Sequence, residues 1–298
     1  MLSNSVSMPK LLIISGPTAT GKTALAIKLA KKFNGELISA DSRQIYQGLD
    51  IGTGKDHPTN IKIHLIDIIK PSEAFSVAQY QRLVEPIIRS IHQNGKLPIL
   101  VGGSGQYINA IINPQETFSI KPNNFLRFFL NKFSLKTLQF TLKTLDFKTF
   151  NSLNNSDINN PHRLIRKIEI KLYSSKIKTT LSPHYQFLHL SLTASNQVLF
   201  SKINQRVKNR LDSGLFTEIK NLLKKYRWSD PGLNTLAYKE FKTGFNQSNI
   251  AQWITDEHNY ARRQKTYLRL LKPTYFEITN PDYPTNLMAL VAKWYNSS

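Results

Sequence analysis

Residues 16–23 read GPTATGKT and match the pattern G-x-x-x-x-G-K-[ST], in which glycines shape a turn that a lysine and a hydroxyl residue follow. In such a loop the backbone N–H groups surround an anion, the next helix adds its dipole, and the lysine adds a point charge. The hydroxyl of Thr23 can hold Mg²⁺ against phosphate oxygens. We therefore predict a diphosphate or triphosphate site formed by Gly16, Pro17, Thr18, Ala19, Thr20, Gly21, Lys22 and Thr23.

A carboxylate follows the next apolar segment. Residues 36–40, ELISA, lead into Asp41, and Ser42, Arg43 and Gln44 come directly after it. Ligands of open α/β sheets bind outside the carboxyl ends of the strands, which would place Asp41 beside the phosphate-binding loop. Asp41 could instead cap the N-terminus of a helix, and Ser42 could serve equally well there. The pattern leaves both interpretations open.

The acid that a nucleoside triphosphatase needs is missing from the third apolar segment. A Walker B carboxylate follows a hydrophobic strand and helps to hold Mg²⁺. Here residues 97–101, LPILV, run into Gly102, Gly103, Ser104 and Gly105. This position indicates a chemistry other than ATP hydrolysis. Ser104 is either a helix N-cap or a hydroxyl that faces the site.

The elements around these residues alternate between strand and helix. Apolar runs at 11–15, 36–40 and 97–101 are typical of buried parallel strands. Helical periodicity at 22–33 and 77–94 separates them. This alternation predicts an α/β fold, a P-loop NTPase-like parallel sheet flanked by helices.

From about residue 117 the strand signals fade, and short helical stretches at 123–133, 134–153 and 161–174 indicate a helical insertion. We predict a core of residues 1–116, a helical insertion domain of residues 117–194, and residues 195–298 that complete the core with basic C-terminal helices. Segment 187–192, FLHLSL, is expected to return to the sheet as a strand. After it we predict helices at 196–212, 215–226 and 248–271, a strand at 274–279 and a final helix.

The chain is strongly basic. Its 298 residues include 40 Lys and Arg against 19 Asp and Glu, a formal net charge of +21. One interpretation is a solvated lysine-rich surface. The other is a polyanionic partner, because neutralisation of phosphates by Lys and Arg supplies most nucleic-acid affinity.

Composition also excludes several classes of protein. The chain has no Cys, which excludes a disulfide scaffold, a thiolate zinc site and thiol catalysis. No apolar run approaches the ~20 residues that a membrane span needs. The start, MLSNSVSMPK, lacks the basic and apolar regions of a signal peptide, so we expect a cytoplasmic protein without membrane partners.

The motifs together resemble the tRNA dimethylallyltransferases, also called tRNA isopentenyltransferases or IPP transferases. The resemblance rests on GPTATGKT, ISADSRQIYQGLDIGTGK, HLIDI and LPILVGGSGQY, and on PHRLIR, INQRV and RRQKT farther along the chain. It covers nearly the whole chain and is weakest over residues 117–160. Ser104 stands where the family usually has Thr, and Gly54 stands where it usually has Ala.

The resemblance implies an activity. The family transfers a dimethylallyl group from dimethylallyl diphosphate to N6 of adenosine 37, in tRNAs that read codons starting with U. The loop would then bind a diphosphate with Mg²⁺ on Thr23, and a Walker B acid would have no use. The anticodon stem-loop of tRNA would account for the positive charge. We expect a monomer.

The resemblance also implies roles for individual residues. Asp41 would accept a proton or hydrogen bond from the adenine amino group, Ser104 would bond near the same centre, and Lys22 and Arg206 would stabilise the departing diphosphate. The residues implied to bind tRNA are Asp41, Ser42, Arg43, Gln44, Ser104, Arg127, His162, Arg163, Leu164, Ile165, Arg166, Lys239, Arg263 and Gln264.

Two other functions are compatible with parts of the pattern. A P-loop kinase of a nucleoside or small metabolite shares the fold, but its lid would need several arginines and residues 117–160 contain only Arg127. A non-enzymatic nucleic-acid-binding switch protein would not need Asp41. An assay of ATP hydrolysis or phosphoryl transfer separates the kinase from the prenyl transferase, and the switch protein would need nucleotide-dependent affinity for nucleic acid.

Overall fold

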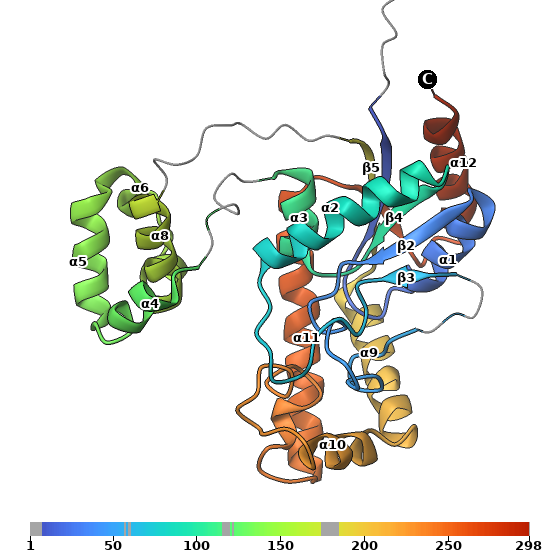
Figure 1. The fold of residues 1–298 in the computed structure, drawn as a ribbon. Helices are drawn as coiled ribbons and strands as arrows, with labels where there is room; N and C mark the ends of the chain where they lie inside the picture. The colour runs from blue at the N-terminus through green and yellow to red at the C-terminus, as the bar shows by residue number, and fades with distance from the viewer. Residues whose placement is uncertain are drawn as a thin grey trace, which may run out of the picture. The chain divides into compact units, whose positions relative to one another are not determined.

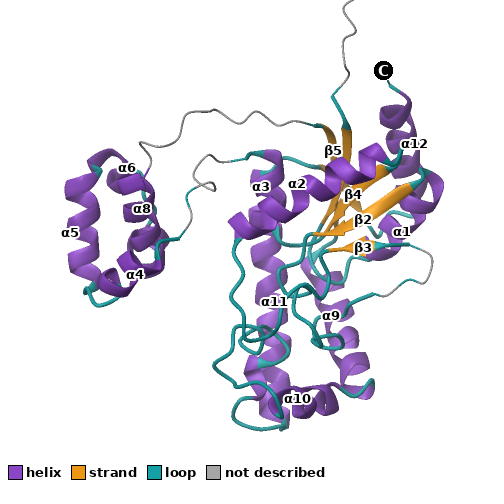
Figure 2. Ribbon diagram, viewed as in Figure 1, coloured by secondary structure: helices purple, strands orange, loops and turns teal. Residues whose placement is uncertain are grey.

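Apolar side chains of the central strands point alternately to the two faces of the sheet. Helices therefore cover the sheet on both faces. The structure is a computed structural model that describes residues 8–56, 58, 61–114, 120, 122–173 and 185–297. Its six parallel strands lie in the order β3-β2-β4-β1-β5-β6 (Figure 2). Their bounds are β1 Lys10–Ser15, β2 Gly35–Ser39, β3 Ile63–His64, β4 Leu97–Val101, β5 Gln186–Thr193 and β6 Thr274–Glu277.

Each face of the sheet has its own hydrophobic core. Leu11 and Ile13 of β1 face α2 (Val77–Gln93) and α3 (Gly105–Ile112), while Leu12 and Ile14 face α1 (Lys22–Lys32) and α12 (Tyr283–Asn296). Figure 1 shows these helices on opposite sides of the strands. The predicted parallel sheet flanked by helices is therefore confirmed. The short strand β3 was not predicted, because only two residues pair with β2.

A third core lies beyond the carboxyl ends of the strands. There α9 (Asn196–Asp212), α10 (Leu215–Leu223), the 3₁₀ turn Lys239–Phe241 and α11 (Gln247–Leu270) pack around Trp253 and the segment that follows β2. The buried residues of α11 recur every three or four positions: Trp253, Glu257, Ala261, Gln264 and Leu268. This spacing keeps them on one helix face. Two of the five are polar, and they reappear in the site described below.

Residues 114–182 form a separate compact unit. It consists of α4 (Asn124–Leu130), α5 (Leu135–Leu145), α6 (Phe147–Asn151), α7 (Asn155–Ile158) and α8 (Pro161–Tyr173). We predicted an insertion that runs to residue 194, and this end is wrong because β5 pairs with β1 inside the sheet. The predicted start at 117, helix end at 174 and N-terminal residues 1–7 lie outside the described residues.

A buried carboxylate ties the helices of this second unit together. Glu169 of α8 is 0% exposed and accepts two hydrogen bonds from Arg127 of α4, each 2.7 Å long. Arg166 donates to it at 3.2 Å and the backbone N–H of Asn123 at 3.1 Å. The pKa of Glu169 is lowered, because these donors outweigh the effect of burial.

No helix within the described part of the chain is long and apolar enough to cross a membrane.

We predict that Glu169→Gln destabilises the second unit by about 3 kcal/mol, because it leaves two guanidinium groups facing a neutral amide. Hydrogen exchange of the full chain should show the loss in α4 and α8. The matched control is Glu85→Gln, which removes one partner of the exposed ion pair with Arg89. Exposed pairs contribute about 0–1 kcal/mol. Equal effects of the two substitutions would contradict the prediction.

Candidate functional site

Three strand ends meet where the predicted site residues lie. The N–H of Gly102, after β4, donates to the carbonyl of Ile14 at 3.1 Å, and the N–H of Ala40, after β2, donates to Val101 at 2.7 Å. A Cβ at Gly102 would lie 2.1 Å from the carbonyl oxygen of Ala40, so only glycine fits there. Asp41 is thereby held at the carboxyl edge of the sheet, next to the end of β1.

The phosphate-binding loop has the backbone that an anion cradle requires. Gly16, Ala19 and Gly21 have φ values of 145°, 66° and 80°. A Cβ at Gly16 would lie 2.5 Å from the carbonyl oxygen of Leu192. Thr20 Oγ1 donates to the carbonyl of Pro17 at 2.9 Å, which closes the turn from inside.

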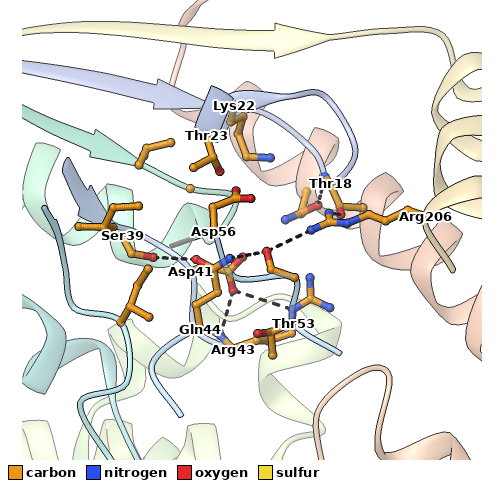
Figure 3. Close-up of a pocket in the computed structure, with 16 residues that line it drawn as sticks. Thr18, Lys22, Thr23, Ser39, Asp41, Arg43, Gln44, Thr53, Asp56 and Arg206 are labelled. Atoms are coloured by element: carbon orange, nitrogen blue, oxygen red, sulfur yellow. Dashed lines mark hydrogen bonds and ion pairs between the residues drawn. The ribbon is translucent and has the colours of Figure 1, made fainter. Parts of the chain in front are cut away.

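One cavity brings the loop and the edge of the sheet together. It is lined by Thr18, Lys22 and Thr23 of the loop, by Ser39, Asp41, Arg43 and Gln44 after β2, by Thr53, Gly54, Asp56, Ile63 and Ile66, and by Val101, Gly102, Arg206 and Gln264. Figure 3 shows Lys22 and Thr23 on one side, Asp41 and Asp56 below them, and Arg206 reaching in from α9. The structure thus places Asp41, Lys22 and Arg206 around one space, and their predicted roles stay predictions.

Lys22 contacts the loop backbone directly. Its Nζ donates to the carbonyl of Pro17 at 2.7 Å. Burial and the neighbouring Arg206 lower the pKa of Lys22 to about 7, while Asp41 acts in the opposite direction. A bound anion would favour the charged form of this lysine.

Asp41 has one oxygen engaged and one directed to the cavity. Its Oδ1 accepts the backbone N–H of Arg43, two residues farther on, at 2.9 Å. Asp41 thus forms an Asx-turn and does not cap a helix. Within the described residues Oδ2 has no hydrogen-bond partner. The interpretation of Asp41 as a helix cap is therefore wrong, and the catalytic interpretation of its second oxygen stays a prediction.

Arg43 and Gln264, which we predicted to contact tRNA, are buried and bonded within the protein. Arg43 donates to Glu257 at 3.2 Å and stacks on Tyr260, with 4.5 Å between its guanidinium carbon and the ring centre. Gln264 accepts the N–H of Thr18 at 2.9 Å and donates to the carbonyl of Gly103 at 3.0 Å. Both side chains hold the walls of the cavity in place.

Arg206 lies over the phosphate-binding loop. Its Nη1 donates to Thr18 Oγ1 at 2.9 Å and its Nη2 to the carbonyl of Gly54 at 3.4 Å. Burial is the main cause that lowers the pKa of Arg206. This guanidinium has no carboxylate partner within the described residues, in contrast to Arg43.

Ser104 lies on a second cavity and not on the first. It occupies the N-cap position of α3, yet its side chain makes no cap hydrogen bond. Instead Ser104 Oγ accepts the N–H of Ser42 at 2.9 Å. The second cavity, about 250 Å³, is lined by Ser42, Gly103, Ser104, Gly105, Gln106, Tyr107, Tyr260, Arg263, Gln264 and Tyr267. Gln264 lines both cavities.

The donor atoms of the first cavity fit a hard cation. Thr23 offers a hydroxyl, and Asp41 and Asp56 offer carboxylates in the same lining. Oxygen ligands of this kind suit Mg²⁺, which is typically held by one or two carboxylates together with substrate phosphates. No cluster of three His, Cys, Asp or Glu suited to a metal occurs among the described residues. A magnesium ion here would thus need oxygens from the ligand.

Sequence reasoning missed Asp56 and Glu257. Asp56 follows a turn and belongs to no motif with the phosphate-binding loop, so the sequence held no signal that it lies in the same cavity. Glu257 had a signal, because it lies on the same helix face as Trp253 and Ala261, where a charged residue is unexpected.

Several residues predicted to bind tRNA serve the second unit instead. Leu164 and Ile165 are 0% and 3% exposed in its core, so their side chains offer no contact to RNA, and this part of the prediction is wrong. Arg127 and Arg166 bond Glu169, and Arg163 pairs with Asp157. His162 and Arg263 are exposed, and Lys239 pairs with Asp256 at 3.2 Å.

Comparisons with known proteins place the chain in a family. A family model described as IPP transferase matches residues 44–270. A tRNA dimethylallyltransferase of Halalkalibacterium halodurans is 35% identical, and the alignment covers 94% of this chain and 95% of the relative. A solved tRNA Δ(2)-isopentenylpyrophosphate transferase of Staphylococcus epidermidis is 28% identical with a TM-score of 0.71, covering 97% of this chain and 100% of the other.

A eukaryotic dimethylallyltransferase whose structures capture it acting on tRNA is 26% identical, with a TM-score of 0.81. That alignment covers 95% of this chain and 78% of the eukaryotic one. The family model spans well over half of the chain, and the curated relative exceeds 30% identity over nearly all of it. The chain therefore belongs to the IPP transferase family.

Proposed function

We propose that this protein transfers a dimethylallyl group from dimethylallyl diphosphate to N6 of adenosine 37 in tRNAs that read codons starting with U. The observation that carries the proposal is the first cavity, in which a phosphate-binding loop faces the carboxylate of Asp41. The names of the relatives support the reaction, and they do not favour the kinase alternative.

The diphosphate would lie against the phosphate-binding loop. Lys22 and Arg206 line the cavity there and would stabilise the negative charge that develops as the diphosphate leaves. Thr23, with Asp56 nearby, would hold Mg²⁺, which when bound supplies further positive charge to the diphosphate oxygens. Hydrolysis of a triphosphate is not proposed, because residues 102–105 after β4 include no acid for it.

The transfer exchanges one bond at C1 and moves one proton. N6 of the adenine attacks C1 of the dimethylallyl group, and the bond from C1 to the diphosphate oxygen breaks with its electron pair on the diphosphate. N6 then carries an extra proton, which Asp41 accepts through Oδ2. The N–H of Arg43 on Oδ1 keeps the carboxylate oriented during this step.

The adenine would approach from the second cavity. Tyr107, Tyr260 and Tyr267 line it and provide apolar ring surfaces, and Ser104 lies between it and the turn that carries Asp41. To reach this place the base must leave the stack of the anticodon loop, at a cost of a few kcal/mol. Aromatic side chains commonly receive such unstacked bases.

We propose that tRNA is held by exposed cations such as Arg263, and that the protein acts as a monomer in the cytoplasm. Arg263 lies on the rim of the second cavity and is exposed. Leu164 and Ile165 are left out of this interface for the reason given above.

The direct test incubates the purified protein with labelled dimethylallyl diphosphate, Mg²⁺ and unmodified tRNA, and then digests the tRNA for nucleoside mass analysis. We expect label in N6-(dimethylallyl)adenosine at position 37. Phosphoryl transfer from ATP without prenylation would overturn the proposal in favour of a kinase.

Asp41→Asn tests the proton acceptor. Asparagine can still accept the N–H of Arg43, so the turn should persist, but it cannot take a proton. We expect single-turnover transfer to slow by roughly 10²–10⁴-fold with an unchanged melting temperature. The matched control is Asp50→Asn, an exposed carboxylate paired with Lys55 outside this cavity. A rate for Asp41→Asn equal to that of the control would remove Asp41 from the mechanism.

The pKa of Lys22 predicts proton uptake on diphosphate binding. Above pH 7 the free lysine is largely neutral, and a bound anion raises its pKa, so binding takes up about one proton at pH 8 and almost none at pH 6. Affinity should therefore fall as the pH rises above 7. Calorimetry with inorganic diphosphate, in buffers of different ionisation enthalpy, measures the uptake.

Lys22→Met is the control for that experiment, because it removes the lysine and leaves the titration of diphosphate itself. The uptake attributed to Lys22 is the difference between the two proteins. If wild type and Lys22→Met take up the same number of protons at pH 8, the titrating group is not Lys22.

A further inference from the structure

A third arginine lies behind the proposed diphosphate site, and neither the sequence motifs nor the proposed mechanism uses it. Arg210 is one helical turn after Arg206 on α9, and its side chain is 7% exposed. Its Nη1 lies 3.5 Å from Oε1 of Glu257. Within the described residues its Nε and Nη2 are buried without a hydrogen-bond acceptor.

Such an arrangement is costly for a structural arginine. Buried polar groups are normally hydrogen-bonded, and buried charges are normally paired. Glu257 cannot neutralise Arg210 alone, because the same Oε1 also accepts from Arg43 at 3.2 Å and from Trp253 at 3.4 Å. Burial and the nearby Arg206 lower the pKa of Arg210 to about 9, so it is still charged at neutral pH.

Gly54 explains how Arg210 fits. A Cβ built on Gly54 would lie 2.5 Å from Arg210 Nη2 and 2.3 Å from Arg206 Nη2. Gly54 itself lines the first cavity, so the missing side chain lets both guanidinium groups reach the wall of the diphosphate site. The family resemblance places alanine at this position. In this chain an alanine at residue 54 would require Arg206 or Arg210 to move.

The charges around this wall do not balance. Among the buried groups, the guanidinium groups of Arg43, Arg206 and Arg210 face the two carboxylates of Glu257 and Asp41. The exposed Asp56 also acts on Arg206, and Lys22 is only partly charged at pH 7. Burial raises the pKa of Glu257, but the guanidinium groups outweigh that effect and keep it ionised. The cluster therefore holds excess positive charge at the place where a diphosphate would lie.

We propose that Arg210 is a buried cation that attracts the leaving diphosphate through the wall of the first cavity. The wall is thin at this point because Gly54 has no side chain. The inference rests on the proposed function, because it takes the diphosphate as the ligand of the cavity. The bound anion offsets the repulsion between Arg206 and Arg210, so binding relieves a strain that the free protein carries. Arg210 thus destabilises the protein without ligand and stabilises its complex with diphosphate.

Arg210→Met separates this role from a structural one. Methionine fills similar space without charge, and Arg43 still pairs with Glu257. We expect inorganic diphosphate to bind roughly 10- to 100-fold more weakly by calorimetry, the effect of losing a cation near a charged ligand. We also expect the melting temperature without ligand to stay the same or rise. Arg89→Met, which removes an exposed charge on α2, should change neither quantity.

Two further variants keep the test decisive. Arg210→Lys keeps a charge and should recover part of the lost affinity, which a role in packing alone would not predict. Gly54→Ala should weaken binding of diphosphate, because its methyl group displaces the arginines. Its control is Gly48→Ala, which has a similar φ of 73° but meets its nearest side-chain atom at an ordinary 3.5 Å.

Lys22→Ala distinguishes failure of this inference from failure of the proposed function. If Lys22→Ala retains diphosphate affinity, the cavity is not a diphosphate site and both ideas fall. If Lys22→Ala loses affinity while Arg210→Met binds within about threefold of wild type, only the role of Arg210 falls. A lower melting temperature with unchanged diphosphate affinity in Arg210→Met would likewise assign it to structure.

Discussion

The ion pairs of Glu257 organise the candidate site. This single carboxylate, almost fully buried, holds Arg43 against the turn that carries Asp41 and holds Arg210 beside Arg206. A buried charge is stable only when its partners surround it closely. The position of the carboxylate on α11 therefore determines where two guanidinium groups lie, those of Arg43 and Arg210, and both contribute to the potential in the cavity.

Helix α11 transmits this organisation to the phosphate-binding loop. Gln264, two turns after Glu257, joins the N–H of Thr18 to the carbonyl of Gly103, so one side chain ties the loop to the segment after β4. Loop, turn and glycine segment then keep a common geometry before any ligand arrives. Preorganised donors of this kind stabilise developing charge without the cost of reorganising during the reaction.

In the second unit, too, a buried carboxylate holds arginines, but there it joins the helices of a separate core. Glu169 gathers Arg127, Arg166 and the N–H of Asn123, and it does so inside a core of leucine and isoleucine side chains. Arg127 and Arg166, which the sequence suggests as RNA-binding residues, donate hydrogen bonds to this internal carboxylate. A basic residue is available to a polyanion only when no buried acid already holds it, which sequence counts of Lys and Arg cannot reveal.

The sequence by itself determined the sheet, the phosphate-binding loop and the place of Asp41. These follow from local rules: apolar runs predict strands, glycines predict the loop backbone, and parallel strands bring their carboxyl ends together. Arg206 and the long C-terminal helix were also predicted, the latter to within one residue at each end. The strand at 187–192 was predicted as well, but the end of the second unit was placed at residue 194, after that strand, whereas β5 pairs with β1 and belongs to the sheet.

Only the tertiary structure decided which charges face the cavity and which face each other. Glu257 lies 214 residues from Arg43 in the chain and 47 from Arg210, and Gln264 lies 246 from Thr18. No periodicity relates residues so far apart. An arginine can be a ligand-binding group, a partner of a buried acid, or a charge behind a glycine that shares its acid with another arginine. Which of these it is depends on packing of α9 and α11 against the sheet edge, and that packing is a property of the folded chain alone.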